Sequence, residues 1–236
     1  MQSAGSKLEN FLGIAFKNKD LLRTALTHRS YLNENPSVSA DGKPAENNER
    51  LEFLGDAVLE LVITEYLYER FPDKPEGELT SLRASLVNAN MLGSVAGDLG
   101  FNDFLLLSRG EARDVGRARQ YILANTFEAF VGALYLDQDH SAVKNFIIKT
   151  LEPKIPEILE KRLYRDSKSL FQEESQERVS ITPTYQVQKE WGPDHDKHFI
   201  VGVYLEKELV AEGEGPSKQT AQQQAAEAAL KAKGWG

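Results

Sequence analysis

The sequence of 236 residues contains no cysteine, so disulfide bonds, thiolate metal sites and cysteine nucleophiles are all excluded. It also lacks any apolar stretch that approaches the length needed to cross a bilayer. The most apolar helical stretch, residues 57–68, still contains Glu60 and Glu65. No signal-peptide pattern opens the chain. We therefore expect a cytoplasmic protein.

Positive charge is scarce as well, and the net charge of −8 has the wrong sign for a protein that approaches a polyanion. Two local groups of basic residues stand out. One is the arginine repeat Arg109, Arg113 and Arg117, spaced four residues apart, with Arg119 beyond it, and the other is Lys161, Arg162, Arg165 and Lys168. Each group could contact phosphates or form an ordinary solvated surface, because acidic residues are interleaved. With 41% hydrophobic residues the chain can still bury a core, and its length suggests one or two domains.

Residues 48–56 read Asn-Glu-Arg-Leu-Glu-Phe-Leu-Gly-Asp. On a helix, this spacing places Glu49, Glu52 and Asp56 along one face, where their charges repel one another. A hard divalent cation would compensate that repulsion, and the carboxylates of Glu52 and Asp56 suit magnesium. The alternative is an amphipathic helix with a solvated acidic stripe.

A second pair of polar residues lies in the mostly apolar helical run 122–134, where Asn125 and Glu128 are about one turn apart. If this helix packs against the acidic one, the two pairs would complete a metal site from four side chains. In the alternative interpretation, Asn125 and Glu128 only bond to neighbouring side chains or backbone.

The hydrophobic periodicity changes along the chain. It is helical from Leu8 to about Tyr164 and is interrupted at Pro153 and Pro156. From Asp166 the pattern predicts a helix, three strands at 184–190, 198–205 and 208–214, and a last alanine-rich helix that Ser217 is placed to cap. We predict an all-α domain over 1–163, followed by a small α-β-β-β-α domain over 164–236.

The chain resembles ribonuclease III, the family of double-stranded RNA endonucleases. The segments that carry the resemblance are residues 26–31, 48–59, 77–88 and 122–137, and a separate match to the double-stranded RNA-binding domain starts near Asp166. The resemblance implies a symmetric homodimer that cuts both strands. It also implies that Phe53 inserts into the partner subunit, whereas packing within its own chain is the alternative.

The implied reaction is metal-assisted hydrolysis of RNA in the processing of ribosomal and messenger precursors. Magnesium, with manganese as an alternative, would be held by Glu52, Asp56, Asn125 and Glu128, and Asp56 and Glu128 would be catalytic. Products would carry 5′-phosphate and 3′-hydroxyl ends. The resemblance also gives His28 a hydrogen-bonding role, whereas we expect Glu49 to act behind the ligands or at the dimer interface. Arg83 is expected to form an internal ion pair.

In the second domain the resemblance assigns RNA contacts to Gln172, His195 and Lys218, with binding to the minor grooves and the intervening phosphates. Gln219 stands where the family pattern has a second lysine. Residues 166–236 carry 12 acidic and eight basic side chains, a net charge of −4. We therefore expect weak RNA binding by this domain alone.

Asn125 also departs from the family pattern, which has aspartate at this position. The substitution keeps an oxygen ligand but removes one negative charge, which should weaken magnesium binding. The chain could be a natural active variant, a natural inactive paralogue or a deliberately substituted protein. We favour an active enzyme because the other three acids are present. The competing hypothesis is a double-stranded RNA-binding protein that does not cleave, and a helical structural protein would leave both motif matches unexplained.

Overall fold

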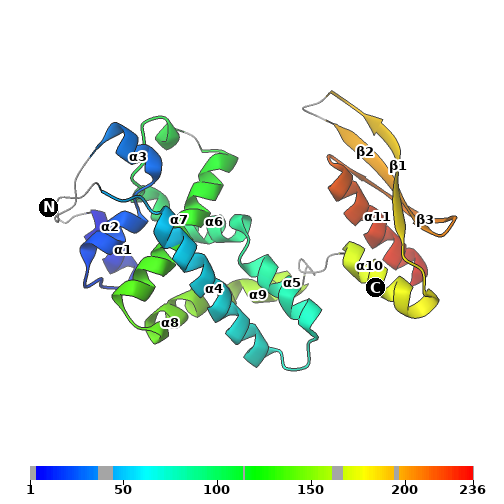
Figure 1. Ribbon diagram of the computed structural model, residues 1–236, viewed down its shortest axis with the longest axis horizontal. Helices are drawn as coiled ribbons and strands as arrows, with labels where there is room; N and C mark the ends of the chain where they lie inside the picture. Colours follow the sequence, from blue (N-terminus) through cyan, green and yellow to red (C-terminus); the bar gives the residue numbers. More distant parts are fainter. Residues whose placement is uncertain (1–3, 37–44, 114, 161–166, 194–196, 236) are drawn as a thin grey trace. The chain divides into compact units, whose positions relative to one another are not determined.

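The structure is a computed structural model that describes residues 4–36, 45–113, 115–160, 167–193 and 197–235. It divides the chain into two compact units, Met1–Tyr164 and Arg165–Gly236 (Figure 1). The domain boundary proposed between residues 163 and 164 lies outside the described residues. Each unit has its own hydrophobic core.

The first unit is helical. Its elements are α1 (Ala4–Leu12), α2 (Lys19–Ala25), α3 (Arg29–Glu34), α4 (Glu49–Arg70), α5 (Glu76–Leu86), α6 (Ala89–Asp98), η1 (Phe101–Asp103), η2 (Glu111–Arg113), α7 (Arg117–Asp137), α8 (His140–Leu151), η3 (Glu152–Lys154) and α9 (Ile155–Glu160). Extended pairing in its described part is limited to one isolated bridge, between Thr27 and Leu106. The prediction of an all-α first domain is confirmed.

Side-chain caps fix where several of these helices begin. The side chains of Asn18, Asn88 and Asp139 accept backbone N–H bonds at the starts of α2, α6 and α8. Each cap satisfies an N–H group that has no partner within its helix. Helix α8 ends just before Pro153, which lies in the short η3 turn, so the break predicted there is confirmed.

Helix α7 forms the centre of the first unit and packs against α2, α4, α6 and α8. Its Phe127 and Phe130 contact the rings of Phe101 and Phe146, with centroids 5.1–6.4 Å apart. All four phenylalanines are buried. Because close-packed interiors resist displacement, α7 is a rigid support for any side chain on its exposed edge.

The second unit contains α10 (Ser167–Val179), β1 (Thr184–Trp191), β2 (His198–Leu205), β3 (Glu208–Gly215) and α11 (Lys218–Lys233). The strands form one antiparallel sheet in the order β1-β2-β3. The predicted α-β-β-β-α order is confirmed, and β1 and β3 each extend one residue beyond the predicted range. Irregular register occurs between Val187 and Lys189 and between Val203 and Tyr204.

Small residues let α11 lie close to the sheet. A methyl group added to Gly213 of β3 would come within 2.1 Å of the backbone nitrogen of Ala225. Phe171 of α10 completes the core beside the buried alanines of α11. Ser217 caps α11 by accepting a bond from the Thr220 backbone N–H, which confirms the predicted cap.

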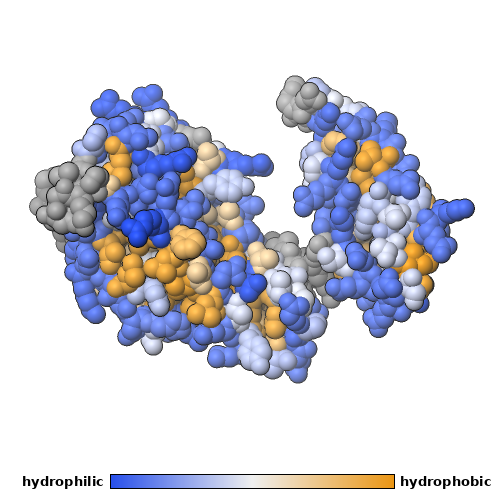
Figure 2. Space-filling view, in the orientation of Figure 1, coloured by the Kyte–Doolittle hydropathy of each residue, from blue (hydrophilic) through white to orange (hydrophobic). Residues whose placement is uncertain are grey.

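Large apolar side chains are exposed along α4: Phe53 is 83% exposed, Leu61 52% and Tyr68 74%. Figure 2 shows hydrophobic residues on the face of the first unit that carries α4. Exposed apolar patches of this kind mark surfaces that contact another molecule. Across the described part of the chain, no helix is both long enough and apolar enough to span a membrane.

Candidate active site

Two glycines bring α4 and α7 into backbone contact. A Cβ atom on Gly55 would lie 1.7 Å from the carbonyl oxygen of Glu128, and one on Gly132 would lie 2.2 Å from that of Leu51. Any other residue would push the helices apart. The close crossing sets Glu52 and Asp56 on α4 beside Asn125 and Glu128 on α7.

Glu128 shows the electrostatic cost of this arrangement. Burial raises the pKa of its carboxyl from 4.5 to about 7, and the nearby charges of Asp56 and Glu52 add to the shift. Burial disfavours the charged form of an acid, and neighbouring negative charges do the same. Glu128 therefore holds a proton over part of the neutral pH range when no cation is bound.

Glu52 is affected in the same direction. Burial raises its pKa, followed by the charge of Glu49, and the charge of Asp56 contributes less. A side-chain hydrogen bond from Asn125 opposes the shift, because it favours the ionised carboxylate. Asn125 is thus directly connected to the acid cluster through Glu52.

The donor set fits a hard divalent cation. Among the residues that the structure describes, no cationic side chain is named among the causes of the pKa shifts of Glu52 and Glu128, whereas nearby carboxylates are. Within the described ranges, no three His, Cys, Asp or Glu side chains are placed to hold one metal ion together. Magnesium commonly binds one or two carboxylates and keeps several waters. An open set of oxygen donors therefore suits this ion better than a closed cage would.

The other predicted positions near the cluster take different roles. His28 caps α3, where its ring accepts a bond from the Ser30 backbone N–H, and burial lowers its pKa. Arg83 forms the predicted ion pair, with Glu60 at 2.7 Å, but the two side chains are 33% and 38% exposed, so the acid is not buried. Glu49 lies 3.7 Å from Arg29 in an exposed pair and acts on Glu52 through its charge.

The arginine repeat does not form a helix face. Arg109 follows the isolated bridge strand, Arg113 ends η2 and Arg117 begins α7, so the four-residue spacing spans three different elements. All three side chains are exposed. Arg119 instead donates to the carbonyl oxygen of Ala112 and holds η2 against the start of α7.

Two of the three predicted RNA-binding residues are described. Gln172 is exposed on α10, and Lys218 is exposed at the first position of α11, with its ammonium 5.6 Å from the centre of the Phe199 ring. The exposed N–H groups and the dipole of a helix start favour phosphate at this end. His195 lies outside the described residues.

Sequence reasoning missed the glycines of the helix crossing. Gly55 and Gly132 each stand inside a long helix, where glycine is unfavourable by about 1 kcal/mol relative to alanine. That unfavourable placement was the available signal. A glycine in such a position usually has a packing reason.

Comparison with known proteins agrees with the geometry. The model of a family described as Ribonuclease-III-like matches residues 18–155, and that of the double-stranded RNA binding motif matches residues 167–233. The chain belongs to the ribonuclease III family. Ribonuclease 3 of Borreliella burgdorferi is 45% identical over 95% of this chain and 89% of its own length. Ribonuclease 3 of Streptococcus pneumoniae is 45% identical over 98% of this chain and 97% of its own.

A solved ribonuclease III structure shares the fold of the first unit. The nuclease domain of the enzyme from Campylobacter jejuni is 40% identical, covers 64% of this chain and 97% of its own, and superposes with a TM-score of 0.55. That structure is described as showing flexibility in a region involved in dimer formation. The matches give no support to the hypothesis of a protein that binds RNA without cleaving it.

Proposed function

We propose that this chain hydrolyses phosphodiester bonds of double-stranded RNA at the acid cluster formed by α4 and α7. The observation that carries the proposal is the close α4–α7 crossing at Gly55 and Gly132, which gathers three acids and the amide of Asn125. The raised pKa of Glu128, about 7, follows from that gathering. Such perturbed carboxyls gather at catalytic sites. The fold places this cluster in the first unit of a chain whose second unit has the double-stranded RNA-binding fold.

Glu52, Asp56, Asn125 and Glu128 are the residues that would hold a divalent cation, and Asp56 and Glu128 are the proposed catalytic pair. When bound, magnesium or manganese supplies a water of lowered pKa and neutralises charge on the reacting phosphate. Asn125 orients Glu52 through their hydrogen bond. Glu128, with a pKa about 7, can hold or release a proton near neutral pH. Cleavage at the 3′ oxygen leaves 5′-phosphate and 3′-hydroxyl ends.

The exposed apolar face of α4 supports a homodimer. Phe53 is 83% exposed in a single chain, which is an unfavourable position for a phenylalanine in water. Insertion of Phe53 into the partner subunit would remove this exposure. A two-fold axis then provides two acid clusters, one for each RNA strand, and staggered cuts leave a short 3′ overhang.

The second unit would bind the double-stranded RNA. Gln172 would contact one minor groove and His195 the next, while Lys218 binds the phosphates between them. The net charge of −4 over residues 166–236 limits the affinity of this unit alone. The proposed substrates are paired segments of ribosomal and messenger RNA precursors in the cytoplasm.

The direct test compares cleavage of a perfectly paired RNA, the same strand unpaired, and a DNA duplex of equal sequence, all with magnesium. We expect fragments from the paired RNA alone. Their 5′ ends should accept a labelled phosphate from polynucleotide kinase only after phosphatase treatment, since they already carry phosphate. Equal cutting of unpaired RNA or of DNA would contradict the proposal.

A further inference from the structure

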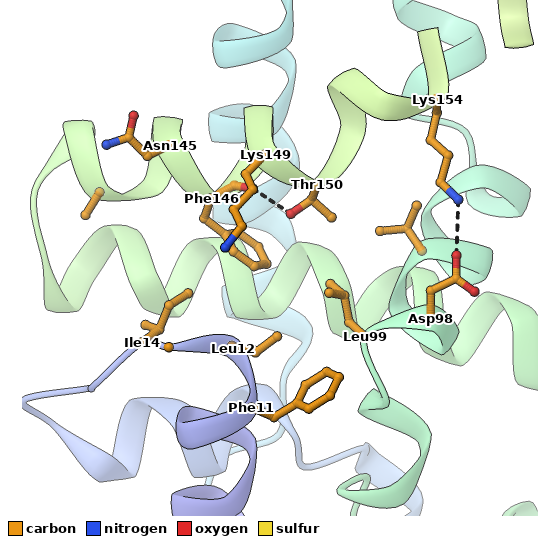
Figure 3. Close-up of a pocket in the computed structure, with 13 residues that line it drawn as sticks. Phe11, Leu12, Ile14, Asp98, Leu99, Asn145, Phe146, Lys149, Thr150 and Lys154 are labelled. Atoms are coloured by element: carbon orange, nitrogen blue, oxygen red, sulfur yellow. Dashed lines mark hydrogen bonds and ion pairs between the residues drawn. The ribbon is translucent and has the colours of Figure 1, made fainter. Parts of the chain in front are cut away.

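A cavity lies in the first unit, between α1, α6 and α8. Its volume is about 470 Å³, and Figure 3 shows its lining residues. None of the four residues of the acid cluster lines it. The volume falls within the range of about 300–1,000 Å³ typical of small-molecule sites.

The wall of this cavity is mainly apolar and is fixed in place. Phe11 and Leu12 come from α1, Val95 and Leu99 from α6 and its end, and Phe146 from α8. Phe146 is held by ring contacts with Phe127 at 5.8 Å and Phe130 at 5.1 Å. By contrast, Phe11 is 67% exposed at the rim. The cavity therefore combines a rigid floor with an open apolar edge.

The two lysines that line the cavity differ in whether their charge is paired. Lys154 pairs with Asp98 at 3.1 Å, so these two charges offset each other. Lys149 is exposed, and it makes no ion pair or hydrogen bond with any residue that the structure describes. In Figure 3 its ammonium extends from α8 toward the α1 side of the cavity. The site thus presents one uncompensated cation beside an apolar wall.

We propose that this cavity binds a small amphipathic anion, with its apolar body against Phe11, Leu99 and Phe146 and its carboxylate at Lys149. Burial of the body removes apolar surface from water, including that of the exposed Phe11 ring. The ammonium of Lys149 selects an anionic head group over a neutral or cationic one. Asp98, the acidic side chain among the lining residues, is offset by its ion pair with Lys154, so it repels the bound carboxylate less than an isolated aspartate would.

The test uses the full chain and three ligands of equal length: decanoate, 1-decanol and decylammonium. Each displaces 1-anilinonaphthalene-8-sulfonate, a fluorescent apolar anion, from the protein. We expect decanoate to bind at one site and more tightly than decanol, with decylammonium the weakest. No saturable displacement, or equal displacement by all three ligands, would overturn the proposal.

Two variants locate the site independently of each other. Lys149→Glu should weaken decanoate binding about fivefold to tenfold and leave decanol binding unchanged, because an attraction becomes a repulsion. Lys17→Glu, a reversal at an exposed lysine outside the cavity, should change neither. Ala142→Trp should fill the cavity and abolish decanoate binding, with circular dichroism used to verify the fold. Undiminished decanoate binding in either cavity variant would overturn the proposal.

Discussion

At the scale of single residues, the repulsion within the acid cluster is reflected in the pKa of Glu128. Its pKa is raised from 4.5 to about 7, so the folded protein binds a proton at Glu128 more tightly than the unfolded chain does. The resulting stabilisation is fully present below about pH 4.5 and is lost as the pH rises through about 7. A protein without bound metal should therefore become less stable over this range.

We predict that Glu128→Gln raises the free energy of unfolding in EDTA at pH 8 by on the order of 1–2 kcal/mol, because the partly exposed carboxylate is removed from the cluster. Near pH 4 the two proteins should be equally stable. Urea unfolding at both pH values measures the difference. Magnesium should stabilise the wild type more than the variant, and an equal effect of magnesium on both would contradict a metal role for Glu128.

Asn125 stands where the family pattern has an aspartate, so the cluster has an amide in place of a fourth carboxylate. We predict that Asn125→Asp lowers the magnesium concentration for half-maximal cleavage several-fold and reduces stability in EDTA, since a fourth carboxylate joins the cluster. Magnesium titrations of the cleavage rate and of the unfolding midpoint measure both effects. An unchanged magnesium requirement would show that this position does not contact the ion.

At the scale of elements, the acid cluster depends on the close crossing of α4 and α7. Gly55→Ala should destabilise the protein by about 3 kcal/mol or more and reduce cleavage strongly, because the added methyl group meets the Glu128 backbone at 1.7 Å. Gly97→Ala is the matched control. A methyl group there meets nothing within 4 Å, so we expect unchanged activity and a gain of up to about 1 kcal/mol. Equal losses of stability and cleavage in both variants would show that the α4–α7 contact is not the reason for the effect of Gly55→Ala.

The helices and strands follow from the local sequence pattern and were therefore predictable. Apolar periodicity predicted the helices of the first unit, alternation predicted the three strands, and Ser217 predicted the start of α11. The approach of α4 to α7 was not predictable in the same way, because it depends on which two glycines face each other across the crossing. Arg109, Arg113 and Arg117 lie on turns as well as helix, because Gly110 and Gly116 lie between them.

The sequence proposed which residues form the candidate site, but it did not show their protonation states. Spacing placed Glu52 and Asp56 on one helix face, and the polar positions inside the apolar run 122–134 added Asn125 and Glu128. The raised pKa values depend on burial between two helices that are remote in sequence, which no local pattern shows. The same holds for the cavity beside Lys149, whose walls come from three separate helices.

At the scale of the whole molecule, the exposed face of α4 predicts self-association. Phe53→Asp should convert a dimer to a monomer without changing monomer stability, because the side chain is 83% exposed within one chain. Val115→Asp, at a residue 87% exposed and outside α4, should leave the assembly unchanged. Sedimentation velocity over a range of concentrations measures both. A wild type that sediments as a monomer throughout would contradict the proposed dimer.

The central claim is that the α4–α7 acid cluster cuts double-stranded RNA with a divalent cation. The most direct measurement follows a long, perfectly paired RNA incubated with the protein in magnesium, in EDTA, and in magnesium with Glu128→Gln. We predict fragments only in the first reaction, with RNA still bound by the variant in a gel shift. Intact but shifted RNA in all three reactions would contradict the claim and leave a protein that binds RNA without cutting it.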